Sequence, residues 1–270
     1  MPGKHSVPIG TTSMVFWYTT LAEGIPLAAE MGYDVIEIWA EHLWKTQEPV
    51  SRIAAALARA GMGCTIHCPI MDVNMTSPNR GIREESVRQV RQSVEMAHDL
   101  GARMLVLHPG RLFSLKDSLE EYWQFQMAAF ERLVPYAQRH NVPVAVENME
   151  VNARVEVVKG APEIRRITGH FAPGQLGVML DTAHLGSTQR ILDFIRDVDG
   201  IAHVHLSDAL VTPAGEMRIH LPLGEGQLDF RAVFDALLPN YQGILSMEAF
   251  IPPGNPDKIR AQREWLETVL

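Results

Sequence analysis

The segment GVMLDTAHLG, residues 177–186, ends a short apolar run on an acid and places a histidine three residues later. Asp181 and His184 are both residue types that bind divalent metals, so this strand end could hold a metal ion. The same residues could instead form an ordinary polar turn in which His184 caps the helix that follows. A single copy of the pattern does not distinguish a metal site from a polar turn. The residues at the other predicted strand ends are therefore needed to decide between them.

Five further apolar runs also end on a metal-binding residue type. In chain order, six consecutive runs end on His67, His108, Glu147, Asp181, His205 and Glu248. Buried strand ends are poor in charged residues, because an unpaired carboxylate there is costly. The last four of these residues offer three carboxylates and one imidazole, and they predict a site for Mn²⁺, Co²⁺, Mg²⁺ or Zn²⁺ with positions open for substrate oxygens. We expect His184 to point into the same pocket and bind substrate or a further metal.

The elements that must position these residues alternate regularly along the chain. Predicted strands lie near residue 7 and at 35–39, 64–67, 103–108, 144–147, 176–181, 201–206 and 243–248. Amphipathic segments predict helices at 20–31, 51–61, 82–101, 118–140, 161–169, 191–198, 230–238 and the C-terminal end. Apolar strands between helices are typical of parallel sheets covered on both faces. The pattern predicts an α/β fold, a (β/α)8 TIM barrel formed as a single domain over residues 1–270.

An open doubly wound sheet is the alternative fold, but no GxGxxG segment follows the first predicted strand. The chain is 46% hydrophobic and 21% charged, which is ordinary for a globular protein with a sizeable core. Its formal net charge of −8 opposes a nucleic-acid surface, because phosphate binding needs clustered Lys and Arg. Arg83, Arg88 and Arg91 are interspersed with acids, a pattern that indicates a solvated helix face.

No signal-peptide core and no apolar stretch of about 18 residues is found, so we expect a cytoplasmic protein without a membrane span. Cys64 and Cys68 lack CxxC spacing, and we expect them to be reduced packing residues. Both expectations follow from composition and spacing alone.

Aromatic residues near the early strand ends are candidate sugar-binding residues. Trp17 follows the first predicted strand and Trp39 ends the second, and either ring could stack on a sugar or simply fill space. Glu37 alternates with apolar neighbours and is expected to face the barrel interior. His203 lies two residues before His205 on the same strand face, where we expect it to orient a ligand residue rather than bind metal.

Five segments together resemble one known superfamily: VENM at 146–149, DTAH at 181–184, HVHLSD at 203–208, GEG at 224–226 and SMEAF at 246–250. They are similar to the xylose isomerase-like TIM-barrel superfamily, which includes D-tagatose 3-epimerase-type sugar epimerases, sugar phosphate isomerase/epimerase proteins and endonuclease IV. The resemblance spans nearly the whole chain. It implies one metal ion, held by Glu147, Asp181, His205 and Glu248.

Within the epimerase branch, the resemblance implies that the metal stabilises an enediolate while Glu147 and Glu248 remove and return a proton on opposite faces of the sugar. His184 and His220 would hold substrate oxygens, although the family has an Arg at the position of His220. The other two histidines of the strand ends, His67 and His108, would bind a substrate phosphate or hydroxyls. The expected partner is a small-molecule sugar or sugar phosphate, with no nucleic acid and no membrane. A homo-oligomer is also expected, since relatives commonly form dimers or tetramers.

Endonuclease IV implies a different function for the same residues. Its trinuclear zinc site suggests a second metal on His67 and His108, bridged by the glutamate of the fifth strand, and part of a third on His184 and His220. That third zinc also needs an Asp at the position of Arg218. We therefore predict a metal-dependent isomerase/epimerase, with an endonuclease IV-like multinuclear zinc phosphoester hydrolase as the alternative. A lyase acting on a polyhydroxy acid and a non-catalytic binding barrel are further classes.

Overall fold

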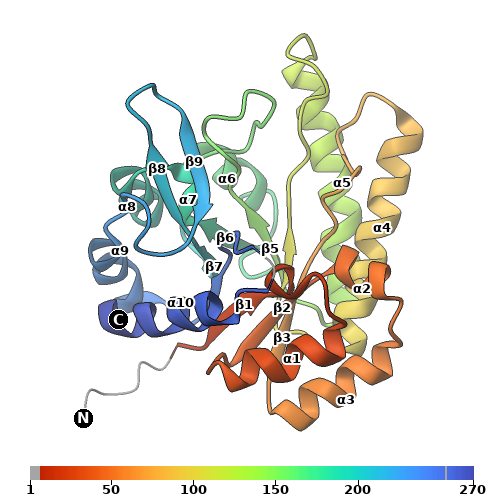
Figure 1. Ribbon diagram of the computed structural model, residues 1–270. Coiled ribbons are helices and arrows are strands. Elements are labelled where there is room, and N and C mark those ends of the chain that lie inside the picture. The colour runs from red at the N-terminus through yellow and green to blue at the C-terminus, as the bar shows by residue number, and fades with distance from the viewer. Residues whose placement is uncertain (1–6, 253) are drawn as a thin grey trace.

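The computed structural model describes residues 7–252 and 254–270. Eight parallel strands close into a barrel in the order β1-β10-β7-β6-β5-β4-β3-β2 (Figure 1). These strands are β1 (Ile9–Thr12), β2 (Val35–Trp39), β3 (Gly63–His67), β4 (Leu105–Leu107), β5 (Val144–Glu147), β6 (Gly177–Asp181), β7 (Ile201–Leu206) and β10 (Ile244–Met247). The predicted (β/α)8 barrel is confirmed, and the open doubly wound sheet is wrong.

In the described part of the chain, eight helices of eight or more residues connect the barrel strands or follow the last of them, and they pack around the outside of the barrel (Figure 1). They are α1 (Leu21–Glu30), α3 (Val50–Ala60), α4 (Arg80–Asp99), α5 (Leu119–Arg139), α6 (Ala161–Thr168), α8 (Thr188–Asp197), α9 (Phe230–Leu237) and α10 (Pro256–Val269). Each buries one apolar face, represented by Ile53, Phe130 and Ile164, in the core between helices and strands. Within the described ranges, none of the helices is long and apolar enough to cross a membrane.

The alternation of side chains along the strands determines which residues face the barrel interior. Val106, Ala145 and Met179, from three neighbouring strands, form a small apolar cluster separate from the main core. Glu147 and Asp181 lie two residues beyond Ala145 and Met179, so they share the inward direction at the carboxyl ends of their strands. The strand period therefore places both carboxylates in the mouth of the barrel.

Several short elements were not predicted. Helices α2 (Ala40–Thr46) and α7 (Thr182–Leu185) follow β2 and β6 directly, and 3-10 turns η1 (Ser13–Phe16) and η2 (Leu238–Asn240) follow β1 and α9. An antiparallel hairpin, β8 (Asp208–Val211) and β9 (Met217–Leu221), is inserted between β7 and α9. The hairpin packs against α7 (Figure 1). Because it carries His220, this insertion completes the mouth of the barrel.

The loop after β4 is held tightly against α5. A Cβ added at Gly110 would lie 2.3 Å from Thr76 Oγ1, so only glycine fits in this close approach. The Gly110 N–H donates to Gln126 Oε1 (2.6 Å), and the Tyr122 hydroxyl donates to the Gly110 carbonyl (2.7 Å). These contacts explain the HPG segment, because they fix the chain directly after His108.

Candidate metal centre

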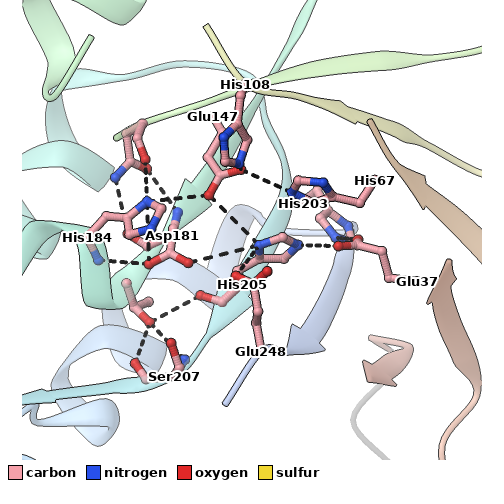
Figure 2. Close-up of polar contacts among 12 residues, drawn as sticks. Glu37, His67, His108, Glu147, Asp181, His184, His203, His205, Ser207 and Glu248 are labelled. Carbon is pink, nitrogen blue, oxygen red and sulfur yellow. Dashed lines mark hydrogen bonds and ion pairs between the residues drawn. The ribbon is translucent and has the colours of Figure 1, made fainter. Parts of the chain in front are cut away.

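Four side chains converge at the carboxyl end of the barrel, and they come from four neighbouring strands (Figure 2). Each offers one ligand atom, and these atoms all lie within 4.8 Å of one another. The four residues are buried, and they are Glu147, Asp181, His205 and, directly after β10, Glu248. The structure thus brings together the complete ligand set that the sequence analysis named.

The ring of His205 is oriented by Glu37, which is fully buried inside the barrel. His205 Nε2 donates to Glu37 Oε1 (2.6 Å), while Nδ1 faces Glu248 Oε2 at 2.8 Å (Figure 2). A neutral imidazole carries one N–H, so a proton on Nε2 leaves a lone pair on Nδ1. Carboxylates that accept from the far nitrogen commonly fix the tautomer of a metal-binding histidine.

Glu37 is itself held from two further sides. Thr65 Oγ1 donates to Glu37 Oε2 (2.9 Å), and His203 Nε2 lies 2.7 Å from the same oxygen. His203 is therefore connected to His205 through Glu37 and lies one layer deeper in the barrel. This arrangement agrees with the expectation that His203 orients a ligand residue and that Glu37 faces inward.

Three buried polar atoms of the central group have no aligned hydrogen bond with any described residue. They are Glu147 Oε2, Asp181 Oδ2 and His205 Nδ1. A buried polar atom without a partner costs free energy, so these three atoms need an explanation. A divalent cation among the four ligands would provide a partner for such atoms, and three carboxylates with one imidazole suit Mn²⁺, Co²⁺, Mg²⁺ or Zn²⁺. The residues fit a metal ion.

The charges of this group depend on its histidines. Burial would raise the pKa of Glu248, but His205 lowers that pKa to about 2. Burial likewise opposes the charged form of Glu147, yet His108 and His67 hold its pKa well below the usual value. For Asp181, burial dominates and raises the pKa. The carboxylates therefore need positive charge beside them, which protonated imidazoles supply when no cation is bound.

His67 and His108 form a second group with Glu147, whose ligand atoms also lie within 4.8 Å of one another. The Nε2 atoms of the two rings are 3.7 Å and 2.9 Å from Glu147 Oε2 (Figure 2). His67 Nδ1 donates to the Cys68 carbonyl (2.7 Å), which leaves Nε2 as the nitrogen that faces the group. The Trp39 ring stacks on His67 at 4.5 Å between ring centroids, so Trp39 lies beside the site.

A third group consists of Asp181, His184 and His220. The Asp181 carboxylate accepts the backbone N–H of His184 (2.8 Å) and so caps α7. Ser187, and not His184, caps the following helix α8. His184 Nδ1 donates to the Asn148 carbonyl (2.8 Å), which leaves Nε2 free for a ligand. His220 has φ +53°, a backbone region that residues other than glycine rarely adopt. Such strained positions cluster at functional sites.

Trp17 lies outside these groups. Its ring packs against His42 at 5.2 Å between centroids, and Lys45 Nζ lies 4.6 Å from the ring centre. Stacking of Trp17 on a sugar stays a prediction. The two cysteines, Cys64 and Cys68, are free and buried, in agreement with a packing role.

Two residues that support the site were not predicted from the sequence. Asn148 Nδ2 donates to the Asp181 carbonyl (3.2 Å), and its Oδ1 accepts the Asp181 N–H (2.9 Å). Asp208 Oδ2 accepts the N–H groups of Gly224 (3.1 Å) and Gly226 (2.9 Å), which orders the GEG segment. A signal was present, because Asn148 directly follows the predicted ligand Glu147 in VENM, and Asp208 lies three residues after His205 in HVHLSD.

Comparison with known proteins agrees with the resemblance seen in the sequence. Residues 25–269 match the family model of the xylose isomerase-like TIM barrel. The chain belongs to this family. An uncharacterized protein of Methanocaldococcus jannaschii is 25% identical over 246 residues, which cover 88% of this chain and 82% of that protein. A probable endonuclease 4 of Mycobacterium marinum is 29% identical over 213 residues, which cover 76% of this chain and 81% of that protein.

A crystal structure of a D-tagatose 3-epimerase-like protein has a TM-score of 0.83 and 23% sequence identity to this chain. The match covers 97% of this chain and 96% of that one. At this identity the likeness shows the fold alone. This xylose isomerase-like TIM barrel is thus similar both to a protein named as an endonuclease and to one named for an epimerase, so its activity has to be argued from its own site.

Proposed function

We propose that the protein is a metal-dependent sugar or sugar-phosphate isomerase/epimerase in which Glu147 and Glu248 transfer protons. The observation that supports this proposal is the position of the two glutamates. In the barrel, β6 and β7 lie between β5 and β10, so Glu147 and Glu248 flank Asp181 and His205 from opposite sides. A sugar bound at the centre would then meet one carboxylate on each face, which is what epimerisation requires.

The cofactor of this proposal is one divalent metal, held by Glu147, Asp181, His205 and Glu248. When bound, such an ion acts as a Lewis acid that makes the C–H next to a ketose carbonyl more acidic and stabilises the negative charge left behind. The chain supplies the proton acceptors and the groups that orient the sugar.

Glu147 and Glu248 are both held as carboxylates at neutral pH by neighbouring imidazoles, so either can accept the proton. The return step needs a proton on the other glutamate. His184 Nδ1 lies 3.4 Å from Glu147 Oε1 and His220 Nδ1 lies 3.8 Å from Glu248 Oε2, so an imidazole lies close to each carboxylate. The same two rings would also bind substrate oxygens, and His67 and His108 would bind the next oxygens along the sugar.

Metal content per chain tests this assignment directly. Elemental analysis of protein purified without added metal or chelator should give about one Mn, Co, Mg or Zn per chain, the number that one four-ligand site holds. Two or three zinc ions per chain would support phosphoester hydrolysis instead. Metal-free protein that binds no divalent ion on titration would contradict both assignments.

An endonuclease IV-like multinuclear zinc phosphoester hydrolase is the second candidate, and a specific observation favours it. Besides the inner group of Glu37, His203 and His205, two groups of three possible ligands share residues with the central group. They are His67, His108 and Glu147, and Asp181, His184 and His220. Arg218, which stands where endonuclease IV has an acid, is exposed on β9, while Asp181 supplies a carboxylate to the third group. The chain's net charge of −8 opposes binding to a nucleic-acid backbone.

Glu37→Gln is expected to lower metal affinity by about 10- to 100-fold, because an amide no longer fixes the proton of His205 on Nε2. Titration of Mn²⁺ into metal-free protein by calorimetry measures this effect. Glu84→Gln, which changes an exposed glutamate paired with Arg132 on the outer helices, is the matched control. A folded Glu37→Gln protein that binds Mn²⁺ as tightly as the wild type would disprove the orienting role.

A further inference from the structure

A passage leads away from the metal centre past His108. Its inner part is a cavity of about 180 Å³ formed by the loops after β3, β4 and β5 and lined by His108, Arg111 and Glu156, among others. Its outer part is a cavity of about 600 Å³. Val73, Asn74 and Arg111 line both, so the two cavities adjoin. Because His108 also belongs to the group with Glu147, the passage begins at the proposed site of chemistry.

The outer cavity is mainly apolar. Its apolar lining consists of Val73, Pro78, Ile82, Leu112, Phe113 and Val155. Phe113 is 76% exposed and Ile82 is 41% exposed, although both are large hydrophobic residues. Exposed hydrophobic side chains around one cavity indicate a surface that binds an apolar group.

The charges of the passage oppose a phosphate group. Among the described residues that line it, Arg111 is the one Lys or Arg, whereas Asp72, Glu150 and Glu156 are acidic. Arg111 also pairs through its backbone with Glu156. Anions are repelled from a lining in which acids outnumber cations. Burial raises the pKa of Glu156 to about 7, so near neutral pH this carboxyl is partly protonated and can donate to a hydroxyl.

We infer that the passage binds an uncharged apolar substituent of the sugar, so that the substrate class is a keto sugar that carries such a substituent, as a glycoside with a ring ketone does, and neither a free sugar nor a sugar phosphate. This inference rests on the proposed function, because the sugar itself occupies the metal centre. Glu156 in the inner cavity and Arg111 at the junction would face the polar linkage, and Phe113 and Ile82 would contact the substituent. The combined space falls in the range of roughly 300–1,000 Å³ that is typical of small-molecule sites.

Binding of a matched pair of ligands tests the inference. The probes are phenyl β-D-glucopyranoside and methyl β-D-glucopyranoside, which differ in the substituent, together with D-glucose 6-phosphate, titrated into Mn²⁺-loaded protein by calorimetry. Val73→Phe fills the junction of the two cavities. Val211→Phe, at an exposed valine of β8 that lines neither cavity, is the control.

We expect the phenyl glycoside to bind at least about tenfold more tightly than the methyl glycoside to the wild type and to Val211→Phe, because the phenyl ring buries apolar area. In Val73→Phe this ratio should fall to about one while methyl glycoside binding stays within about twofold. If Val73→Phe does not fold, Phe113→Ala at the exposed rim is the second variant, with an expected loss of at least about threefold for the phenyl glycoside alone.

Equal affinity for the two glycosides, or no measurable binding of the phenyl glycoside, would overturn the inference. Preferential binding of glucose 6-phosphate that Arg111→Gln removes would overturn it as well. Failure of the proposed function has a different signature: no ketose would exchange a carbon-bound proton with solvent, whereas the phenyl-to-methyl ratio and its loss in Val73→Phe would be unchanged.

Discussion

Glu147→Gln and Glu248→Gln are each expected to lower, by at least about 1,000-fold, proton exchange between solvent and the ketose epimer from which that glutamate removes the proton. A general base contributes about 10²–10⁴-fold, and both residues would also hold the proposed metal. An amide has nearly the same shape as the carboxylate but cannot accept the proton. Exchange is measured by NMR as deuterium incorporation at the carbon next to the carbonyl, with Mn²⁺ in large excess so that weaker metal binding alone does not limit the rate.

The two variants together separate the roles of the two glutamates, one on each face of the bound sugar. If one glutamate removes the proton and the other returns it, each variant should block net epimerisation, whereas only the variant that lacks the base for a given epimer should block the first exchange step. Glu131→Gln, at an exposed glutamate that pairs with His170, is the control and should exchange at the wild-type rate. Full exchange in both site variants would refute the two-glutamate mechanism.

The strand ends could be predicted because strand direction is local in the sequence. In VAVE and GVMLD, a period of two puts Glu147 in the same direction as Ala145, and Asp181 in the same direction as Met179. The fourth strand was predicted to be longer than it is: it ends at Leu107, because His108 already belongs to the HPG loop that Gln126 and Tyr122 hold. The residue was correctly placed at the mouth of the barrel even though the strand boundary was wrong.

The hairpin β8–β9 could not be predicted from the same pattern. Its strands are only four and five residues long, and most of their side chains are partly exposed, so no continuous apolar run marks them. Their position depends on contacts with α7, a helix of four residues that is too short to show a helical period. Gly215, with φ +83° between the two strands, was the available turn signal.

The hydrogen bond between Glu37 and His205 could be predicted only in part. Alternation predicted that Glu37 faces the barrel interior, but the two residues are 168 positions apart, and no local pattern connects them. Barrel closure brings β2 within reach of β7 across the interior. The tautomer of this proposed metal ligand is thus determined by a tertiary contact, and no strand of the sequence taken alone contains that information.

Removal of the metal is expected to lower the melting temperature by about 10 °C. Free metal at 1,000 times its dissociation constant contributes about 4 kcal/mol, and each kcal/mol corresponds to roughly 2–4 °C in a chain of this size.

The stability of the metal-free protein should also depend on pH, in a direction that the buried histidines determine. Burial opposes the charged ring, but in the metal-free protein Glu147 and Glu37 raise the pKa of His67 to about 9. Asp181 and Glu147 likewise raise the pKa of His184 to about 9.

These histidines have an ordinary pKa near 6.5 in the unfolded chain, so the folded state binds protons more tightly. Their stabilising contribution is fully present below about pH 6.5 and is lost as the pH rises through about 9. Metal-free protein should therefore become less stable between pH 6.5 and 9, by a few kcal/mol in the free energy of unfolding. The affinity for the metal should instead increase as the pH rises, because protons compete with the metal for the same nitrogen and oxygen atoms.

The difference in stability between metal-loaded and metal-free protein should consequently increase from pH 6.5 to pH 9. Urea denaturation at pH 6.5, 7.5 and 9, with Mn²⁺ or with EDTA, measures both curves. His170→Gln removes an exposed histidine that contacts Glu131 on the surface, and it should leave both pH dependences unchanged. Metal-free protein with the same stability at pH 6.5 and pH 9 would mean that the carboxylates of the site do not hold protonated imidazoles, and that the positive charge beside Glu147 comes from another source.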